Sequence, residues 1–378
     1  MKEYSVELKK YLEERGFGIT DTAGASAIPN MNSGIRRLRG TWAWTLLKPA
    51  RVVYNYGRLF YNICGHGGVR RAFKAMFMKK PFSKKYIKSL FLTKEELEKQ
   101  RNEVFSKDIT FSILVPLFNT PENYLRDMID SVVNQTYGKW ELCLADASDD
   151  AHAYVGEVCK TYYEKDKRIV YKKLEKNMGI SENTNVCIQM ATGNFISLFD
   201  HDDILIPTAL YENMKVICEK DADFIYTDEA TFLGNNIYDI VTYHFKPDFA
   251  IDNLRANNYI CHFSSFDRTL IDKVGMFSTQ YDGSQDHDMI LRLTAAAKNV
   301  VHIPKLLYLW RSHKNSVSQD INSKTYAIDA GKRAVRDSIL REGMNATVES
   351  SPAFPTIYKI NYEIIGNPLI SIIIPNNI

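Results

Sequence analysis

From residue 111 onward, short apolar runs alternate with segments of helical length, and this alternation constrains the fold more than any other feature. Such runs predict strands, and the segments between them predict helices. The predicted strands are 111–116, 140–146, 169–174, 195–199 and 224–227, and the predicted helices are 151–164, 181–191 and 207–220. Thr120 is predicted to cap a further helix, with Pro121 at its first position. Strands and helices that alternate at this spacing favour an α/β fold with a parallel, doubly wound sheet.

Polar residues follow several of these predicted strands directly. Asn119, Asp146 and Asp200 each stand at or just beyond a strand end. In doubly wound sheets, ligands bind beyond the carboxyl ends of the strands. We therefore expect these side chains to converge on one edge of the sheet.

The sharpest local feature is the sequence Asp-His-Asp-Asp at residues 200–203. Its crowded carboxylates repel one another unless a positive charge lies among them. A hard divalent cation with oxygen ligands, which also grips a diphosphate, would supply that charge. The alternative is a solvated acidic turn or a helix cap. The residues alone leave both interpretations open.

Composition bounds the class of protein. The 378 residues are 45% hydrophobic and 25% charged, which is typical of a soluble globular chain. The 6 cysteines are scattered without a CxxC pair, which favours free thiols in a reducing compartment. The charged N-terminus does not resemble a secretory signal, and no apolar stretch approaches the length of a membrane-spanning helix. These features predict a cytoplasmic location.

The N-terminal part is strongly basic. No acidic residue lies between Asp21 and Glu95, whereas 15 Lys and Arg lie between Arg36 and Lys94, interleaved with aromatic residues. Nucleic-acid binding is disfavoured, because no motif of a known nucleic-acid-binding module accompanies the charge. Two interpretations stay open: docking on an anionic membrane surface, or a basic helical region packed on the acidic remainder of the chain.

The C-terminal tail repeats an earlier pattern. Residues 368–377, Pro-Leu-Ile-Ser-Ile-Ile-Ile-Pro-Asn-Asn, resemble residues 110–119, Thr-Phe-Ser-Ile-Leu-Val-Pro-Leu-Phe-Asn. A strand that opens a second copy of the fold explains the repeat, and an edge strand of the first domain is the alternative. The predicted organisation is a basic, aromatic-rich helical region at 1–109, an α/β domain at 110–350, and a linker with the first strand of a truncated second domain at 351–378.

Several ordered motifs resemble those of glycosyltransferase family 2, in the bacterial branch with tandem domains that builds rhamnose-containing and related surface polysaccharides. They include Phe111-Ser-Ile-Leu-Val-Pro-Leu-Phe-Asn119, Trp140-Glu-Leu-Cys-Leu-Ala-Asp146, Ala191-Thr-Gly-Asn-Phe-Ile-Ser-Leu-Phe-Asp-His-Asp-Asp203, Tyr226-Thr-Asp-Glu229, Asn258-Tyr-Ile-Cys-His262, Gly283-Ser-Gln-Asp-His-Asp288 and Leu307-Tyr-Leu-Trp-Arg-Ser-His313. The resemblance covers roughly residues 111–348 and implies a GT-A fold, that is, a Rossmann-like, mostly parallel sheet flanked by helices.

The resemblance also implies a role for each matching residue. Asp286 matches the general base that takes the proton of the acceptor hydroxyl. Asp202 matches the carboxylate that ligates the metal, Mg²⁺ or Mn²⁺, and His313 lies where the family often places a residue that contacts metal or diphosphate. Arg311 could be a further donor to the diphosphate, and Asp203 is expected to be structural. The residues that match the nucleotide-sugar pocket are Pro116, Phe118, Asn119, Asp146 and Asp200.

For the chain as a whole, the resemblance implies inverting, metal-dependent transfer of a sugar from a nucleotide-sugar donor. The acceptor would be a glycan, free or linked to polyprenyl diphosphate, in bacterial cell-surface polysaccharide synthesis. The chain would then act in the cytoplasm, peripherally at the inner face of the membrane. The alternative from another class is a non-catalytic, membrane-associated scaffold with a degenerate or truncated transferase fold.

Other polar residues need separate interpretation. Gln285 stands where the family usually has a Glu before the base. Asp228 and Glu229 could orient an acceptor sugar or close a turn, and both interpretations stay open. Cys261 and His262 are not expected to form a catalytic dyad, because adjacent side chains rarely face one another.

Overall fold

A computed structural model of the chain describes residues 84–312, 325–352, 354–367 and 369–375. The chain divides into two compact units, Met1–Ser83 and Lys84–Ile378, and only the second contains described residues. Most of the basic segment and the predicted metal ligand His313 therefore lie outside the described residues. Among the described helices, none is long and apolar enough to cross a membrane.

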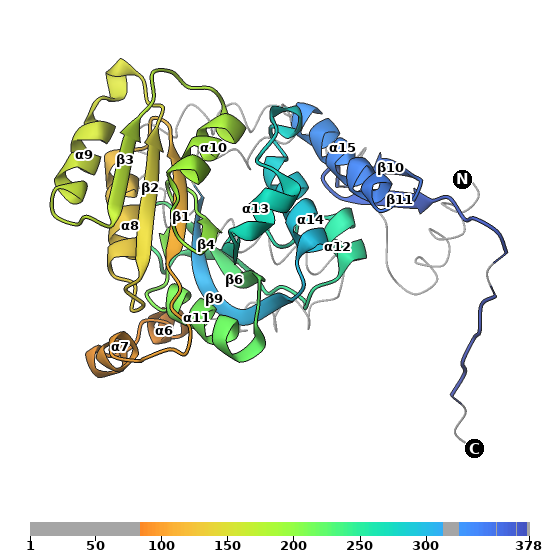
Figure 1. The fold of residues 1–378 in the computed structure, drawn as a ribbon, viewed down its shortest axis with the longest axis horizontal. Helices are drawn as coiled ribbons and strands as arrows, with labels where there is room; N and C mark the ends of the chain where they lie inside the picture. Colours follow the sequence, from red (N-terminus) through yellow and green to blue (C-terminus); the bar gives the residue numbers. More distant parts are fainter. Residues whose placement is uncertain (1–83, 313–324, 353, 368, 376–378) are drawn as a thin grey trace, which may run out of the picture. The chain divides into compact units, whose positions relative to one another are not determined.

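One mixed sheet forms the centre of the described unit (Figure 1). Its strand order is β3-β2-β1-β4-β8-β6-β9-β5, and β7 pairs with β6. The strands are β1 (Phe111–Leu117), β2 (Trp140–Asp146), β3 (Ile169–Lys173), β4 (Phe195–Leu198), β5 (Ile204–Leu205), β6 (Phe224–Leu233), β7 (Ile240–His244), β8 (Ser264–Asp267) and β9 (Val300–Ser312). β5, β7 and β8 run against the other strands, so the expected α/β fold with a mostly parallel sheet is confirmed.

Helices cover both faces of this sheet because its strands carry apolar side chains on both. Ile113 and Val115 pack in one core with α8, α9 and α11, whereas Leu114 faces a second core with α10, α13, α14 and α15. Alternate residues of a strand point to opposite faces, so a strand buried on both is a continuous apolar run. The helices are α6 (Lys84–Ser89), α7 (Lys94–Arg101), α8 (Glu122–Val133), α9 (Tyr154–Tyr163), α10 (Ile180–Met190), α11 (Ala209–Lys220), α12 (Ile251–Ala256), α13 (Thr269–Val274), α14 (Gln285–Ala296) and α15 (Thr325–Arg341).

The prediction that Thr120 caps a helix is wrong. α8 has Pro121 at its N-cap position, without a side-chain hydrogen bond. Thr120 is fully buried, and its hydroxyl lies 2.9 Å from Nδ1 of His201, which follows β4. The Thr120 side chain therefore contacts the residue His201 beyond β4 and does not cap α8.

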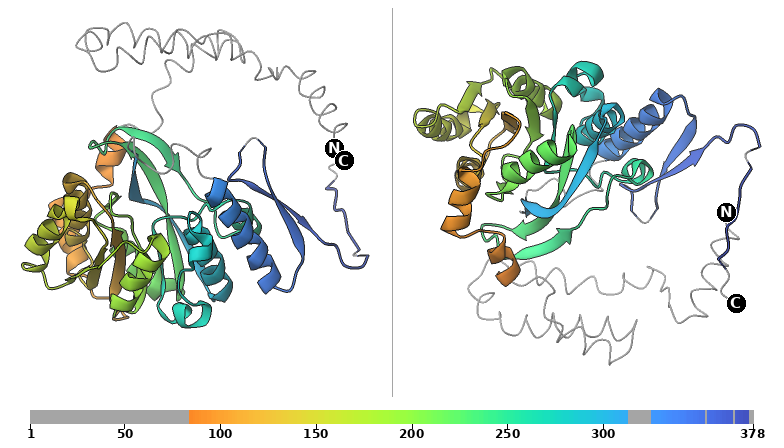
Figure 2. Two further views of the ribbon diagram at one scale, coloured as in Figure 1. Left: turned by 90° about the horizontal axis from the view of Figure 1, so that it is seen from above. Right: turned by 60° about the horizontal axis from the view of Figure 1, so that its bottom comes forward.

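The C-terminal part of the unit adds α15 and the antiparallel hairpin β10 (Ala346–Ser350) and β11 (Tyr358–Tyr362). In both views of Figure 2 this part lies at the opposite end from β1–β3. The domain boundary predicted at residue 350 falls at the end of β10, inside this hairpin. Residues 369–375 pair with no other described strand, and Ile370, Ile372, Ile373 and Ile374 are 78–89% exposed. A second domain after residue 350 stays a prediction.

Gly193, between α10 and β4, lies where the backbone of β4 approaches β1. Its amide donates to Oγ of Ser112 at 2.9 Å and to Glu141 at 3.0 Å. A Cβ at this position would lie 2.5 Å from the carbonyl oxygen of Thr110. Only glycine fits without moving one of the two strands.

We predict that Gly193→Ala lowers the free energy of unfolding by about 1–3 kcal/mol, because the added methyl group overpacks two backbone segments. Denaturant unfolding followed by circular dichroism measures this. Gly138→Ala is the matched control, since the nearest atom to its Cβ, on Arg168, is 4.0 Å away. Equal stability of the two variants would contradict the prediction.

Candidate active site

The carboxyl ends of three neighbouring strands meet at one edge of the sheet, as the sequence predicts. β1 lies between β2 and β4, with Leu117 opposite Asp146 and Leu114 opposite Leu198. A cavity opens beside these ends, between α10 and the first turn of α14. Its lining residues are Leu114, Pro116, Ile180, Thr184, Leu198, Phe199, Asp200, His262, Phe277, Gln285 and Asp286.

Asp200 and His262 form a charged pair in this cavity. Nε2 of His262 lies 3.2 Å from Oδ2 of Asp200. Burial lowers the pKa of His262, but the carboxylates of Asp200 and, less strongly, Asp286 outweigh it and raise that pKa well above its ordinary value. Burial raises the pKa of Asp200, yet His262 holds it below its usual range. The pair therefore places an imidazolium against a carboxylate.

Asp286 shares the cavity from the other side, in the first turn of α14. Burial raises the pKa of this carboxyl group, and Asp200 acts in the same direction. His262 opposes the rise, as does Gln285, whose Nε2 donates to Oδ2 of Asp286 at 3.2 Å. The net pKa of Asp286 is raised, which suits a carboxylate that takes up a proton during a reaction.

His262 is the residue of this site that sequence reasoning missed. The expectation that it does not pair with Cys261 agrees with the structure, because its imidazole meets Asp200 instead. The expectation rested on adjacency in the chain, which says nothing about a partner 62 residues away (262 − 200). The one signal in the sequence was its place in the motif Asn258-Tyr-Ile-Cys-His262.

Three of the residues assigned to a nucleotide pocket lie along the end of β1. Pro116 lines the cavity, and Phe118 is 45% exposed. Asn119 has a left-handed backbone with φ of 52°, and its side chain donates to Oδ2 of Asp149 at 3.0 Å. The end of this strand therefore presents two apolar side chains and one amide side chain.

Asp146, the remaining nucleotide-pocket residue besides Asp200, is 1% exposed at the end of β2. Its Oδ1 accepts a hydrogen bond from the amide of Ser148 at 2.8 Å. Its Oδ2 accepts from the hydroxyl of Tyr171 at 2.8 Å and from Nζ of Lys173 at 3.3 Å. Both oxygens are thus already bonded within the protein.

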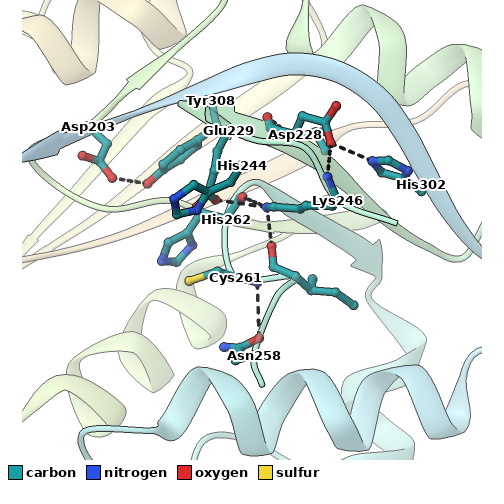
Figure 3. Close-up of polar contacts among 12 residues, drawn as sticks. Asp203, Asp228, Glu229, His244, Lys246, Asn258, Cys261, His262, His302 and Tyr308 are labelled. Carbon is teal, nitrogen blue, oxygen red and sulfur yellow. Dashed lines mark hydrogen bonds and ion pairs between the residues drawn. The ribbon is translucent and has the colours of Figure 1, made fainter. Parts of the chain in front are cut away.

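Asp203 is structural, as expected. It is fully buried; Oδ1 accepts from the amide of Arg311 at 2.6 Å, and Oδ2 accepts from the hydroxyl of Tyr308, as Figure 3 shows. Burial raises the pKa of Asp203 well above its ordinary value, and the neighbouring Asp202 and Asp200 add to the rise. This side chain anchors the acidic turn to β9.

The prediction that Arg311 donates to a diphosphate is wrong. Its side chain is 0% exposed, and Nη2 pairs with Asp127 at 2.9 Å. Nε donates to the carbonyl oxygen of Asp202 at 2.6 Å, and Nη1 to that of Gly234 at 2.8 Å. The guanidinium therefore fixes the backbone of the acidic turn and has no face toward a ligand.

The predicted metal ligands are only partly described. Asp202 is partly exposed next to Asp200 and Asp203. Within the described ranges, no group of three or more His, Cys, Asp or Glu side chains could hold a metal ion. A cation at this turn would therefore take only one or two ligands from the described residues.

Asp228 and Glu229 do not close a turn. Both lie inside β6 and are 3% exposed, so that interpretation is wrong. His302 lies 2.9 Å from Asp228, and Lys246 lies 3.0 Å from Glu229. These side chains form a buried polar network beside the cavity.

Known proteins resemble this chain in sequence over the same region. Residues 112–275 match the family model described as Glycosyl transferase family 2. The uncharacterized protein y4gI of Sinorhizobium fredii is 40% identical over 270 residues, which cover 70% of this chain and 29% of that protein. The O-antigen biosynthesis protein RfbC of Myxococcus xanthus is 30% identical over 265 residues, which cover 70% of this chain and 20% of that protein. The chain thus spans less than a third of the length of either relative.

The fold has a counterpart among solved structures. S. aureus TarS 1-349 in complex with UDP-GlcNAc matches with a TM-score of 0.50 at 18% sequence identity, covering 61% of this chain and 66% of that chain. The matched architecture agrees with the expected GT-A arrangement of a mostly parallel sheet flanked by helices. With the family match over 112–275, these findings show that the chain carries a glycosyltransferase domain of family 2 with a GT-A fold.

Proposed function

We propose that this domain transfers a sugar from a nucleotide-sugar donor to a glycan acceptor, with inversion at the anomeric carbon. One observation carries the proposal: Asp200 and Asp286, from distant parts of the chain, face one cavity at the carboxyl ends of β1 and β4. Ligands of open α/β sheets bind at this edge. The family match supports the same reaction class.

The reaction needs one base and one stabiliser of negative charge. The acceptor hydroxyl oxygen forms a bond to the anomeric carbon while the bond from that carbon to the diphosphate oxygen breaks. The nucleoside diphosphate leaves with the electron pair, and the hydroxyl proton goes to the carboxylate of Asp286. A single displacement by one attacking group inverts the configuration at the anomeric carbon.

The chain's own residues contribute orientation and charge. The pKa of Asp286 is raised by burial, so its carboxylate binds a proton more readily than an exposed aspartate. Asp200 is held as an anion by His262, which suits hydrogen bonds from donor hydroxyl groups. Asp146, already bonded on both oxygens, would shape the pocket through Tyr171 and Lys173.

A divalent cation, Mg²⁺ or Mn²⁺, fits the acidic turn. Asp202 offers a partly exposed carboxylate, and Mg²⁺ in phosphate sites takes one or two carboxylates together with substrate phosphates. When bound, the cation would neutralise charge on the leaving diphosphate. Arg311 holds the carbonyl of Asp202 and so fixes the ligand's backbone. His313 remains a proposed second ligand.

For the acceptor, we propose a bacterial surface glycan, free or carried on polyprenyl diphosphate. One relative is named an O-antigen biosynthesis protein, which supports this class. The basic aromatic segment between Arg36 and Lys88 would hold the chain at the inner face of the membrane, through attraction to anionic lipids. A second domain would follow residue 350, as the repeated tail pattern predicts.

We expect Asp202→Ala to abolish metal-dependent binding of nucleoside diphosphates and to lower sugar transfer by roughly 100-fold or more, because the charge of the leaving group is no longer offset. Calorimetric titration of UDP, GDP and dTDP, with and without Mn²⁺ or Mg²⁺, measures the binding. Asp329→Ala, an exposed carboxylate on α15, is the control. Full transfer activity in a folded Asp202→Ala protein would refute the metal assignment.

Asp286→Asn should lower kcat by about 10²–10⁴-fold, the usual contribution of a general base, while donor binding is retained. In the wild type, the acidic limb of the pH–rate profile should lie above the ordinary aspartate pKa of about 3.9, because the pKa of Asp286 is raised. The residual activity of Asp286→Asn should lack this limb. Retention of the limb would assign the proton to another group.

Gln285→Glu tests the same assignment in the opposite direction. The change removes the hydrogen bond to Asp286 and adds a negative charge beside it. Both effects raise the pKa of Asp286 further, so the acidic limb should move to higher pH. A limb that stays in place or moves down would show that Asp286 is not the titrating base.

A further inference from the structure

A buried ion pair lies beside the cavity, between β6 and the segment that follows β7. Nζ of Lys246 is 3.0 Å from Oε2 of Glu229, and the two side chains are 3% and 4% exposed. The other oxygen of Glu229 lies 3.0 Å from Nδ1 of His244. Charged groups so deeply buried are retained only with complete partners. The remaining hydrogen-bond acceptors of Lys246 therefore indicate what this ion pair holds in place.

The ammonium group of Lys246 has three donors, and the structure gives each of them an acceptor. Besides Glu229, Nζ donates to the carbonyl oxygens of Ile260 and His262, at 2.5 Å each. The backbone amide of Lys246 donates to Oδ1 of Asp228 at 2.8 Å, so the residue is held at both ends. Figure 3 shows these contacts converging from β6 onto the segment of Cys261 and His262. Lys246 therefore ties two alternate carbonyls of one segment to β6.

The position of His262 is not explained by the bonds of its own ring. Its Nε2 meets Asp200, but Nδ1 is buried without a hydrogen-bond partner in the described structure. The ring also lies over Tyr308, with centroids 5.5 Å apart and planes at 24°. A buried polar atom without a partner persists only where the surroundings over-determine the conformation. The two carbonyl bonds from Lys246 supply such a constraint on the backbone of His262.

We propose that Lys246, held by Glu229, is a positioning residue that acts through His262: it fixes the backbone that presents the imidazole to Asp200. This inference rests on the proposed function, because it assigns a role within the same cavity. Glu229 holds the amino group of Lys246 against this segment, and Lys246 itself is not among the residues that line the cavity. Displacement of His262 would leave Asp200, in the same cavity as Asp286, without the imidazole that pairs with it.

The test separates positioning from simple stabilisation by removing the charges together. Lys246→Met alone leaves the Glu229 carboxylate buried without its ion-pair partner, and this protein can fail to fold. The main variant is therefore the double variant Glu229→Gln, Lys246→Met. It restores neutrality in the core but cannot hold the carbonyls of Ile260 and His262. If the ion pair only stabilises the fold, the stable double variant should recover the turnover of the wild type. If Lys246 positions His262, turnover should stay about 10–100-fold below that of the wild type.

A readout free of turnover comes from the imidazole resonances of histidine-labelled protein, which contains 8 histidines. His262→Ala identifies the resonance of His262. We expect this resonance to shift or broaden in the Glu229→Gln, Lys246→Met protein. In the control Asp288→Asn, Arg292→Met it should stay in place, although that pair is also buried and Arg292 also donates to loop carbonyls.

A double-mutant cycle completes the test. If Lys246 acts through His262, adding Glu229→Gln and Lys246→Met to His262→Ala should lower turnover no further. Additive losses, or an unchanged His262 resonance in the folded double variant, would overturn the positioning role. A shifted resonance with unaltered turnover would overturn it as well. A wild-type chain that neither binds nor turns over any donor would instead refute the proposed function, and the resonance would still decide whether Lys246 holds His262.

Discussion

Crowded negative charge at the end of β4 is the constraint on which the rest of this site depends. Carboxylates this close cannot all be anionic without compensation. The protein compensates each differently: Asp203 is buried with a raised pKa, and Asp200 is held as an anion by His262. Asp202 has its carbonyl bound by the buried Arg311 and its carboxylate left partly exposed. One short turn thus divides into an anchor, a charged pair and a group that can meet a ligand.

The strands that lead to this turn could be predicted, because strands buried on both faces appear in the sequence as short runs of mostly apolar residues. β2 was predicted with the bounds observed, and β1 and β4 to within one residue. A central parallel strand is a largely apolar run, and in β2 and β4 an aspartate stands at or just beyond the carboxyl end. Asp146 and Asp200 follow that rule, so their convergence on one edge of the sheet could be inferred from the order of residues alone.

The side chains that offset or position these carboxylates could not be predicted, because they come from segments without a regular apolar pattern. His262 stands in the irregular stretch before β8, and Lys246 follows the largely exposed β7. Nothing in a local window distinguishes a lysine that will be buried from one that will be solvated. Arg311 is the opposite case. Its place in the sequence suggested a donor to the diphosphate, but the folded chain buries it and pairs it with Asp127.

β9 shows how the backbone brings these groups together. Between Thr227 and Asp228 of β6 the register shifts, because Pro304 and Lys305 of β9 have no partner there. Proline cannot donate to a ladder, and a bulge bends a strand and re-aims its side chains. Beyond the bulge, Tyr308 reaches Asp203 and stacks under His262, and Arg311 reaches the carbonyl of Asp202. A regular β9 would place both side chains elsewhere along the strand, so this irregularity belongs to the architecture of the site.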